Sequence, residues 1–285
     1  MDDPNPSLLV VVVDANAEQW TARSQSREPE LVKYDELVGV VTLFCNAYSL
    51  MHRQNRLAIV AASDGGCKQI YPRREDENTN EDFLVVGHTL PPIITSGLLG
   101  DDLTKRMAGG SGGSNAGSGG GLALAKCLSR ALCIINRQMT THADLQSRIL
   151  VMKIAKDHSP SYNSVMNSIF SADKLNIPVD SVVLGSKDSL FLQQASFLTN
   201  GVYLKPQDQR DLLQLLLTHC ISSSHTRKLG LSTPKQEAVD FRASCFCHRK
   251  PVEFAYMCSV CLALTCEPTS TCRTCSSERV SAVSS

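Results

Sequence analysis

Four short apolar runs, each followed by a segment with helical spacing, constrain the fold of this 285-residue chain more than any other feature. Each run is rich in β-branched residues and almost continuously apolar, which is typical of a strand buried on both faces. The runs span residues 8–13, 56–62, 148–155 and 177–185, and weaker strand candidates lie near Ile70 and Tyr203. Because the runs do not alternate with polar residues, they predict a sheet that helices cover on both sides.

Amphipathic segments separate these runs. Apolar residues recur at helical spacing from Leu37 to Met51 and from Leu124 to Ile135, and further helices are expected at residues 162–174, 189–198 and 208–217. The apolar fraction of 42% is sufficient for a buried core. Alternation of strands and helices along the chain predicts an α/β fold with a doubly wound, mostly parallel sheet.

Charge and hydropathy exclude two classes of function. The 28 basic and 28 acidic residues cancel, so the chain lacks the excess of cations that a DNA-coating protein needs, and we expect no major direct DNA contact. The acidic N-terminus carries an apolar run too short for a signal peptide, and no stretch approaches the roughly 18 apolar residues that span a bilayer. We therefore expect an intracellular protein with no membrane contact, in which disulfide frameworks are rare.

A glycine- and serine-rich tract interrupts the pattern at residues 109–121. Neither GxxxxGK[ST] nor GxGxxG occurs there in register with a strand, so a phosphate-binding loop is not favoured. A flexible linker is the better interpretation of this composition. Together with the polar residues upstream, it predicts a long loop inserted in the domain at residues 73–121.

Asp14 directly follows the first predicted strand, at the sheet edge where open α/β folds bind ligands. This position resembles the start of the metal-ion-dependent adhesion motif of von Willebrand factor A domains, Asp-x-Ser-x-Ser. Here Asn16 and Glu18 replace the two serines, and Asp157 is the nearest match to the final aspartate of that motif. Since Mg²⁺ requires near-octahedral oxygen ligands, we favour a different role, in which the Asp14 carboxylate accepts hydrogen bonds from loop backbone. A metal at this degenerate edge remains the alternative.

No catalytic set stands out in the sequence. There is no Gly-x-Ser-x-Gly elbow, and the seven histidines are scattered. Five cysteines mostly lie on apolar helix or strand faces, as expected of small buried hydrophobes: Cys45, Cys67, Cys127, Cys133 and Cys220. The sequence therefore predicts neither an enzyme nor a small-molecule substrate.

The remaining seven of the twelve cysteines crowd into residues 245–275. Two C-x2-C pairs, Cys258/Cys261 and Cys272/Cys275, stand ten residues apart. Each pair can turn two thiolates toward one point, and two such pairs supply the closed tetrahedral cage of a structural Zn²⁺ site. A thioredoxin-like redox centre would have a single pair in a strand–helix context, so it fits this spacing poorly.

The other members of this block form a second, weaker zinc set: Cys245, Cys247, His248 and Cys266. The ligand order resembles that of RING-type or treble-clef modules. Simultaneous ligation by the adjacent Cys247 and His248 would be strained, so the number of bound zinc ions, one or two, stays open. The block has little apolar mass, and a structural zinc contributes on the order of 10–16 kcal/mol of folding free energy.

A degenerate von Willebrand A domain followed by this cysteine block resembles the Tfb4 family, the smaller von Willebrand A/zinc-finger subunit of the transcription and DNA-repair factor TFIIH. The resemblance covers nearly the whole chain except residues 73–121, and the stretches LLVVVVDAN, RILVMKIAKD and TNGVYLKP carry it together with the cysteine block. It implies a nuclear, non-enzymatic subunit of the core complex that opens DNA in RNA polymerase II initiation and nucleotide excision repair. It also implies binding to the zinc-finger region of the larger von Willebrand A/zinc-finger subunit and to other core subunits.

The predicted organisation is a von Willebrand A-like domain at residues 1–225, a linker at 226–243, a zinc-finger module at 244–276 and a tail at 277–285. A RING-like component of a ubiquitin ligase is the alternative function, because the cysteine order is similar. A metal-dependent adhesion domain would need the hydroxyl residues that Asn16 and Glu18 replace.

Overall fold

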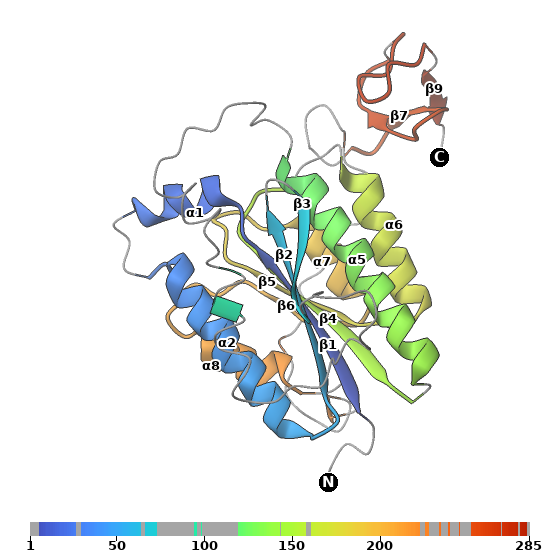
Figure 1. Cartoon of the computed structure of the whole chain (residues 1–285). Coiled ribbons are helices and arrows are strands. Elements are labelled where there is room, and N and C mark those ends of the chain that lie inside the picture. The colour runs from blue at the N-terminus through green and yellow to red at the C-terminus, as the bar shows by residue number, and fades with distance from the viewer. Residues whose placement is uncertain are drawn as a thin grey trace.

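Helices cover both faces of one six-stranded sheet in the computed structural model of this chain (Figure 1). The structure describes residues 6–26, 30–63, 66–72, 119–142, 144–157, 161–222, 252–268, 270–278 and 280–283, and the separate residues 94, 95, 98, 226, 227, 234, 239 and 245. Most of the predicted insert, together with Cys247 and His248, lies outside these residues.

The sheet has the strand order β3-β2-β1-β4-β5-β6, and all neighbours are parallel except β2 and β3. This order confirms the doubly wound, mostly parallel α/β fold. The edge strand β3 pairs with a register shift at Ile59/Val60, and the opposite edge strand β6 has only two residues. The strands are β1 (Ser7–Asp14), β2 (Arg56–Ser63), β3 (Gly66–Tyr71), β4 (Gln146–Lys153), β5 (Val179–Val183) and β6 (Tyr203–Leu204).

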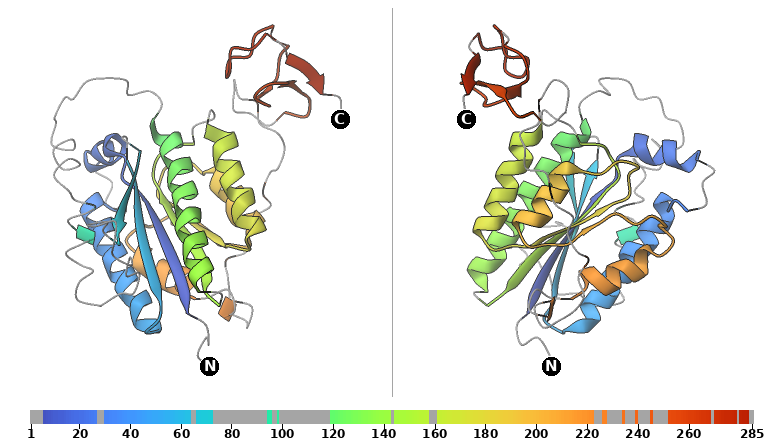
Figure 2. Two further views of the ribbon diagram at one scale, coloured as in Figure 1. Left: turned by 45° about the vertical axis from the view of Figure 1, so that its right-hand side comes forward. Right: turned by 180° about the vertical axis from the view of Figure 1, so that it is seen from behind.

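One group of helices packs with a π-helical turn on one face of the sheet, and a second group packs on the other face (Figure 2). The first group is α1 (Ala17–Ser24), α2 (Tyr34–Met51), α8 (Leu212–Leu215) and the turn η2 (Leu216–Cys220). The second group is α5 (Gly119–Thr141), α6 (Tyr162–Lys174) and α7 (Leu190–Leu198). In the part of the chain that the structure describes, no helix combines the length and apolarity needed to cross a bilayer.

The register of β1 explains why its sequence is continuously apolar. Leu9, Val11 and Val13 pack into the core on the α2 side. The alternate residues Leu8, Val10 and Val12 pack into the core on the α5 side. Because successive strand residues point to opposite faces, and both faces of β1 pack into a core, apolar residues are favoured at every position from Leu8 to Val13.

Several element boundaries differ from the predicted ones, and the predicted helix at 208–217 is a short helix at Leu212–Leu215 followed by a π-helical turn. β4 begins at Gln146 and ends at Lys153 rather than spanning 148–155, because the next two backbone N–H groups bind Asp14 instead of continuing the ladder. β5 ends at Val183, two residues before the predicted end at 185. Helix α5 begins at Gly119, so the last three residues of the glycine-rich tract form its first turn.

A buried ion pair fastens the chain to the sheet just beyond η2. The Arg227 guanidinium donates to both carboxylate oxygens of Asp180 on β5, at 2.7 and 2.6 Å, and to the carbonyl oxygen of His219 at 3.0 Å. The Asp180 side chain is fully buried and also accepts the backbone N–H of Val202 at 2.9 Å. Arg227 lies in the predicted linker, yet it contributes to the structure of the domain that contains the sheet, called the sheet domain below.

A three-stranded antiparallel sheet organises the cysteine-rich part, residues 252–283, called the cysteine module below. Its order is β8-β7-β9, with strands Ala255–Cys258 (β7), Leu264–Thr265 (β8) and Val280–Val283 (β9). Only three described residues form its buried cluster, Cys258, Ala263 and Cys272, with Cys261 packed against them. Such a core is too small to fold without a cross-link or a metal. The Asn163 side chain on α6 donates to the carbonyl oxygen of Cys261 at 3.0 Å.

Candidate metal centre and ligand edge

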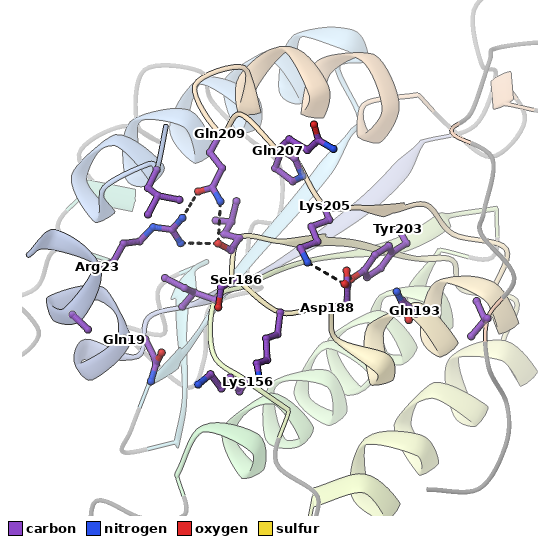
Figure 3. Close-up of a pocket in the computed structure, with 18 residues that line it drawn as sticks. Gln19, Arg23, Lys156, Ser186, Asp188, Gln193, Tyr203, Lys205, Gln207 and Gln209 are labelled. Carbon is purple, nitrogen blue, oxygen red and sulfur yellow. Dashed lines mark hydrogen bonds and ion pairs between the residues drawn. The ribbon is translucent and has the colours of Figure 1, made fainter. Parts of the chain in front are cut away.

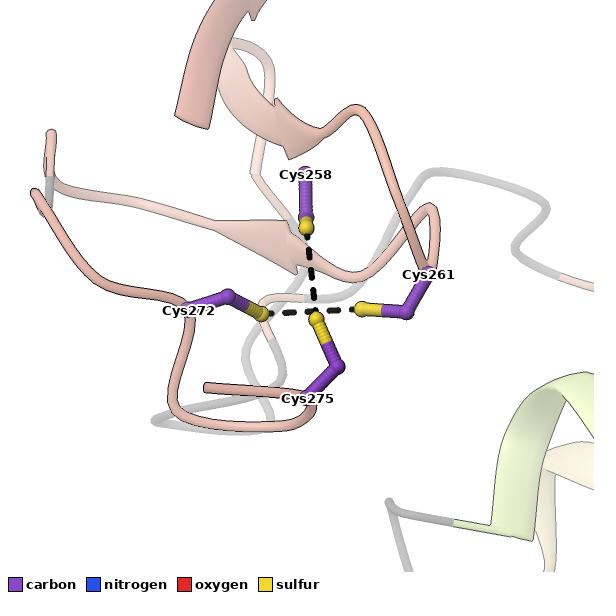
Figure 4. Close-up of side chains that lie close together, drawn as sticks. All are labelled: Cys258, Cys261, Cys272 and Cys275. Carbon is purple, nitrogen blue, oxygen red and sulfur yellow. Dashed lines mark hydrogen bonds between the residues drawn. The ribbon is translucent and has the colours of Figure 1, made fainter. Parts of the chain in front are cut away.

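The structure brings the four cysteines of the two C-x2-C pairs to one point (Figure 4). Their sulfur atoms all lie within 4.8 Å of one another, and the Cys258–Cys275 and Cys261–Cys272 Sγ distances are 3.6 and 3.5 Å. Tetrahedral zinc with Zn–S bonds of about 2.3 Å would place its sulfurs about 3.8 Å apart. The arrangement can therefore hold a metal ion with little adjustment.

The two knuckles have the same backbone structure. In the first, the N–H of Leu262 donates to the carbonyl of Cys258 at 2.9 Å, and in the second, the N–H of Ser276 donates to that of Cys272 at 2.8 Å. The residue after each pair has a positive φ, 58° for Leu262 and 60° for Ser276. This conformation costs energy for a residue other than glycine. Its presence at both equivalent positions shows how the chain turns two sulfurs toward one point.

Hydrogen bonds favour thiolate at Cys258, whereas burial raises the pKa of its knuckle partner Cys261 to about 12. The Ser277 hydroxyl and the backbone N–H groups of Cys261 and Val260 lower the pKa of the Cys258 thiol to about 6. In the second knuckle, the N–H of Thr274 donates to Cys272 Sγ at 3.4 Å. Because metals bind thiolates, such donors prepare sulfur for ligation and orient it.

The structure tests only part of the second predicted zinc set. The backbone N–H of Cys266 lies 3.2 Å from the sulfur of the buried Cys245, and this sulfur raises the pKa of the Cys266 thiol. Two of the four predicted ligands therefore lie side by side. The other two, Cys247 and His248, fall outside the described residues, so a second zinc stays a prediction.

The protein's own backbone surrounds the Asp14 carboxylate. Oδ2 accepts the N–H groups of Ala155 and Ile154 at 2.9 and 3.2 Å, and Oδ1 accepts that of Asn16 at 3.2 Å. These bonds confirm the expectation that Asp14 accepts from loop backbone. Burial raises the pKa of this carboxyl above its ordinary value, although the three N–H groups and the nearby Lys153 ammonium oppose the shift.

Asn16 caps a helix that the sequence analysis did not predict. Its Oδ1 accepts the backbone N–H of Gln19 at 3.0 Å, and α1 begins at the next residue, Ala17. Glu18 is exposed in the first turn, where a negative charge favours the helix dipole. The two residues that replace the hydroxyls of the adhesion motif thus stabilise a helix start. Asparagine followed by an acidic residue is the N-cap signal that could have revealed α1.

Groups of the protein itself also bind the Asp157 carboxylate. It forms an ion pair with the buried Lys153, accepts the Ser189 hydroxyl at 2.6 Å and accepts the N–H of Phe191 at 3.3 Å at the start of α7. A buried ammonium near Asp14 also disfavours a second cation. Among the described residues, only the four module cysteines form a set of three or more His, Cys, Asp or Glu side chains arranged for a metal.

We expect replacement of Asp14 by alanine to lower the free energy of unfolding by about 1–3 kcal/mol at pH 7, because buried N–H groups lose their acceptor. The wild-type advantage should shrink as pH rises above 3.8, since the folded state with its raised pKa holds the Asp14 proton more tightly than the unfolded state. Urea unfolding at a series of pH values measures both effects. The control is Asp173→Ala, which changes an exposed side chain on α6.

The same experiment tests the metal interpretation. Millimolar Mg²⁺ should leave the wild-type unfolding midpoint unchanged, because an ion that does not bind the folded state more tightly than the unfolded state cannot stabilise the protein. A Mg²⁺-dependent stabilisation that Asp14→Ala abolishes would contradict our assignment of Asp14 as a backbone acceptor.

A cleft of about 810 Å³ lies between α1 and the loops that follow β4, β5 and β6 (Figure 3). Arg23 of α1 donates to the carbonyl oxygen of Leu184 at 2.8 Å and also binds Gln209. Lys205 pairs with Asp188 at 3.0 Å, and the Tyr203 hydroxyl donates to the same carboxylate at 3.1 Å. Four cationic residues and one carboxylate line the cleft: Arg23, Lys156, Lys187, Lys205 and Asp188. The sequence analysis did not predict it, because its lining comes from separate loops.

The fold and the cysteine centre define a class of protein: a von Willebrand factor A-like domain followed by a small cysteine module with the geometry of a metal site. The chain belongs to the transcription factor Tfb4 family, whose profile matches residues 6–276.

Several relatives support this membership. The chain is 38% identical over 257 residues to general transcription factor IIH subunit 3 of Dictyostelium discoideum, covering 86% of this chain and 68% of that protein. It is 34% identical over 282 residues to the general transcription and DNA repair factor IIH subunit tfb4 of Schizosaccharomyces pombe, covering 95% and 88%. The crystal structure of the TFIIH p34 N-terminal domain is similar in fold, with a TM-score of 0.60 at 22% identity over 75% of this chain and 98% of that chain.

Proposed function

We propose that this protein is a non-enzymatic structural subunit of the TFIIH core complex, acting in the nucleus in RNA polymerase II initiation and nucleotide excision repair through protein–protein contacts. Family membership and the names of the relatives support the complex. The observation that best supports action through protein–protein contacts is the apolar surface of the cysteine module.

This surface consists of three exposed side chains around the first knuckle. Phe254, Val260 and Leu262 are 74%, 69% and 58% exposed. Exposed apolar side chains of this size favour contact with a partner protein. The charged residues of the module at 252–283 are three glutamates and two arginines: Glu253, Glu267, Glu278, Arg273 and Arg279. Since nucleic-acid binding needs an excess of cations, a protein is the better partner for this surface.

Zinc is the metal that the module fits. Four thiolates in a closed tetrahedral set suit Zn²⁺, whereas Mg²⁺ and Ca²⁺ require oxygen ligands. The ligands are Cys258, Cys261, Cys272 and Cys275. The metal would replace the apolar core that the module lacks.

The cleft between α1 and the loops that follow β4, β5 and β6 provides a second contact surface. Arg23 is held by Leu184 and Gln209, and Lys205 by Asp188, whereas Lys156 and Lys187 are exposed at the rim. This lining favours an acidic segment of a partner protein. The cleft is therefore the expected site for the zinc-finger region of the larger von Willebrand A/zinc-finger subunit of TFIIH.

We expect co-expression with that larger subunit to give a stable one-to-one complex on size exclusion. The double variant Lys156→Glu/Lys187→Glu should weaken the complex about tenfold or more, because charge reversal at a contact makes attraction into repulsion. Lys174→Glu, at the exposed end of α6, is the matched control and should bind like the wild type.

Separate outcomes test the parts of this proposal. Elution of the two wild-type subunits apart at micromolar concentration would contradict the scaffold function. Equal binding by the double variant and the control would instead contradict only the cleft as contact site. Ubiquitin transfer by this chain in the presence of a conjugating enzyme would favour the RING-like alternative.

A further inference from the structure

Two cysteines from different elements meet beside the edge strand of the sheet. Cys67 lies on β3 opposite Ala62 of β2, and Cys127 lies on α5, which packs against β3. Cys67 packs against the buried cluster that contains Cys127, and the Cys127 thiol donates to the carbonyl oxygen of Ala61 at 3.6 Å, one residue before the strand partner of Cys67. Cys127 is buried, whereas Cys67 is half-buried and reaches the surface.

Two cations of α5 lie close to this pair. The Lys126 ammonium is 3.9 Å from the point that a Cβ on Gly66, the neighbour of Cys67, would occupy. The Arg130 guanidinium donates to Gln69 Oε1, two residues beyond Cys67 on the same strand, at 3.1 Å. Both positive charges therefore lie close to residues that flank Cys67 on β3.

This environment shifts the pKa values of the two thiols in opposite directions. The neighbouring Cys127 thiol, together with the cations Arg130 and Lys126, lowers the pKa of the Cys67 thiol despite its partial burial. The neighbouring Cys67 sulfur, together with burial, raises the pKa of the Cys127 thiol. One sulfur is thus favoured as a thiolate at the surface, and the other is held as a thiol behind it.

We infer that Cys67 is a nucleophilic thiolate and a site of oxidative modification, with Cys127 as its resolving thiol. The Cys67 thiolate attacks one oxygen of a hydroperoxide, the O–O bond breaks, and the leaving alkoxide or hydroxide takes up a proton. Cys127 then attacks the sulfenic sulfur of Cys67, and the hydroxyl group leaves as water with the Cys127 proton. Two thiols and one hydroperoxide give one disulfide, one alcohol or water molecule, and one water.

Alkylation of the wild-type protein tests the reactivity of Cys67 without any variant. Cys133 is the internal control, because it is exposed on the same helix. Trypsin places Cys67 in peptide 57–68, Cys127 in 127–130 and Cys133 in 131–137. With limiting iodoacetamide at pH 7, the folded, zinc-replete chain should be modified at Cys67 about threefold or more faster than at Cys133. Equal or faster modification of Cys133 would overturn the inference.

Hydrogen peroxide tests the second step. The folded protein should give a disulfide between peptides 57–68 and 127–130, and Cys133→Ser should give the same product. In Cys127→Ser the disulfide should be lost and a dimedone adduct should appear at Cys67. Absence of the disulfide in the wild type, or linkage of Cys67 to Cys133 instead, would overturn the resolving role of Cys127.

Discussion

Cys258→Ser is expected to unfold the cysteine module and to lower the zinc content of the protein by one ion per chain. The free energy of zinc binding to such a site is on the order of 10–16 kcal/mol, which the three-residue cluster of the module cannot replace. The thermal transition of the sheet domain should stay within about 2 °C of the wild type, because its two cores share no buried residue with the module. Elemental analysis and calorimetry measure the two effects.

Cys133→Ser is the matched control for this experiment, since Cys133 is exposed on α5 and far in sequence from the knuckles. It should retain the wild-type content of one or two zinc ions. A zinc content near zero in the metal-replete wild type, or an unchanged content in Cys258→Ser, would contradict the assignment of the ligands.

Arg227→Met is expected to destabilise the sheet domain by about 3–5 kcal/mol, because it leaves the buried Asp180 carboxylate without its cation. Arg210→Met is the control, since the Arg210–Asp208 pair is exposed and solvent screens its attraction, so its loss should change stability little. Urea unfolding of the zinc-replete chain measures both.

A double variant separates loss of the cation from loss of packing. Asp180→Asn keeps an acceptor for the N–H of Val202 and removes the buried charge. Arg227→Met/Asp180→Asn should therefore lose less stability than the sum of the two single variants. Strict additivity would mean that the pair is not coupled, and a loss below about 1 kcal/mol in Arg227→Met would mean that Arg227 leaves the sheet in solution.

The strands and the cysteine centre could be predicted because each depends on a local pattern. Burial on both faces requires continuous apolarity, so β1 and β4 are visible in the sequence. The two knuckles need only C-x2-C spacing to turn their sulfurs inward, and four thiolates at one point then favour one shared ion.

The missed features depend on partners that sequence spacing does not reveal. Helix α1 buries only Ala17 and Trp20, which is too few apolar residues to give a periodic pattern. Asp180 and Arg227 are 47 residues apart in sequence, and Cys67 and Cys127 meet only because α5 packs on β3. The sequence pattern around Asp14 shows which metal ligands are missing. It does not show that the buried ammonium of Lys153 lies near Asp14 and pairs with Asp157.

The edges of the sheet restrict how this protein can assemble with others. Strand addition by a partner, or by a second copy of the chain, requires a long straight row of unpaired backbone N–H and C=O groups. β6 has two residues, and the pairing of β3 shifts register at Ile59/Val60, so neither edge supplies such a row. Both ends of the sheet thus resist open-ended polymerisation, and recognition by the sheet domain is left to side chains on its loops and helices.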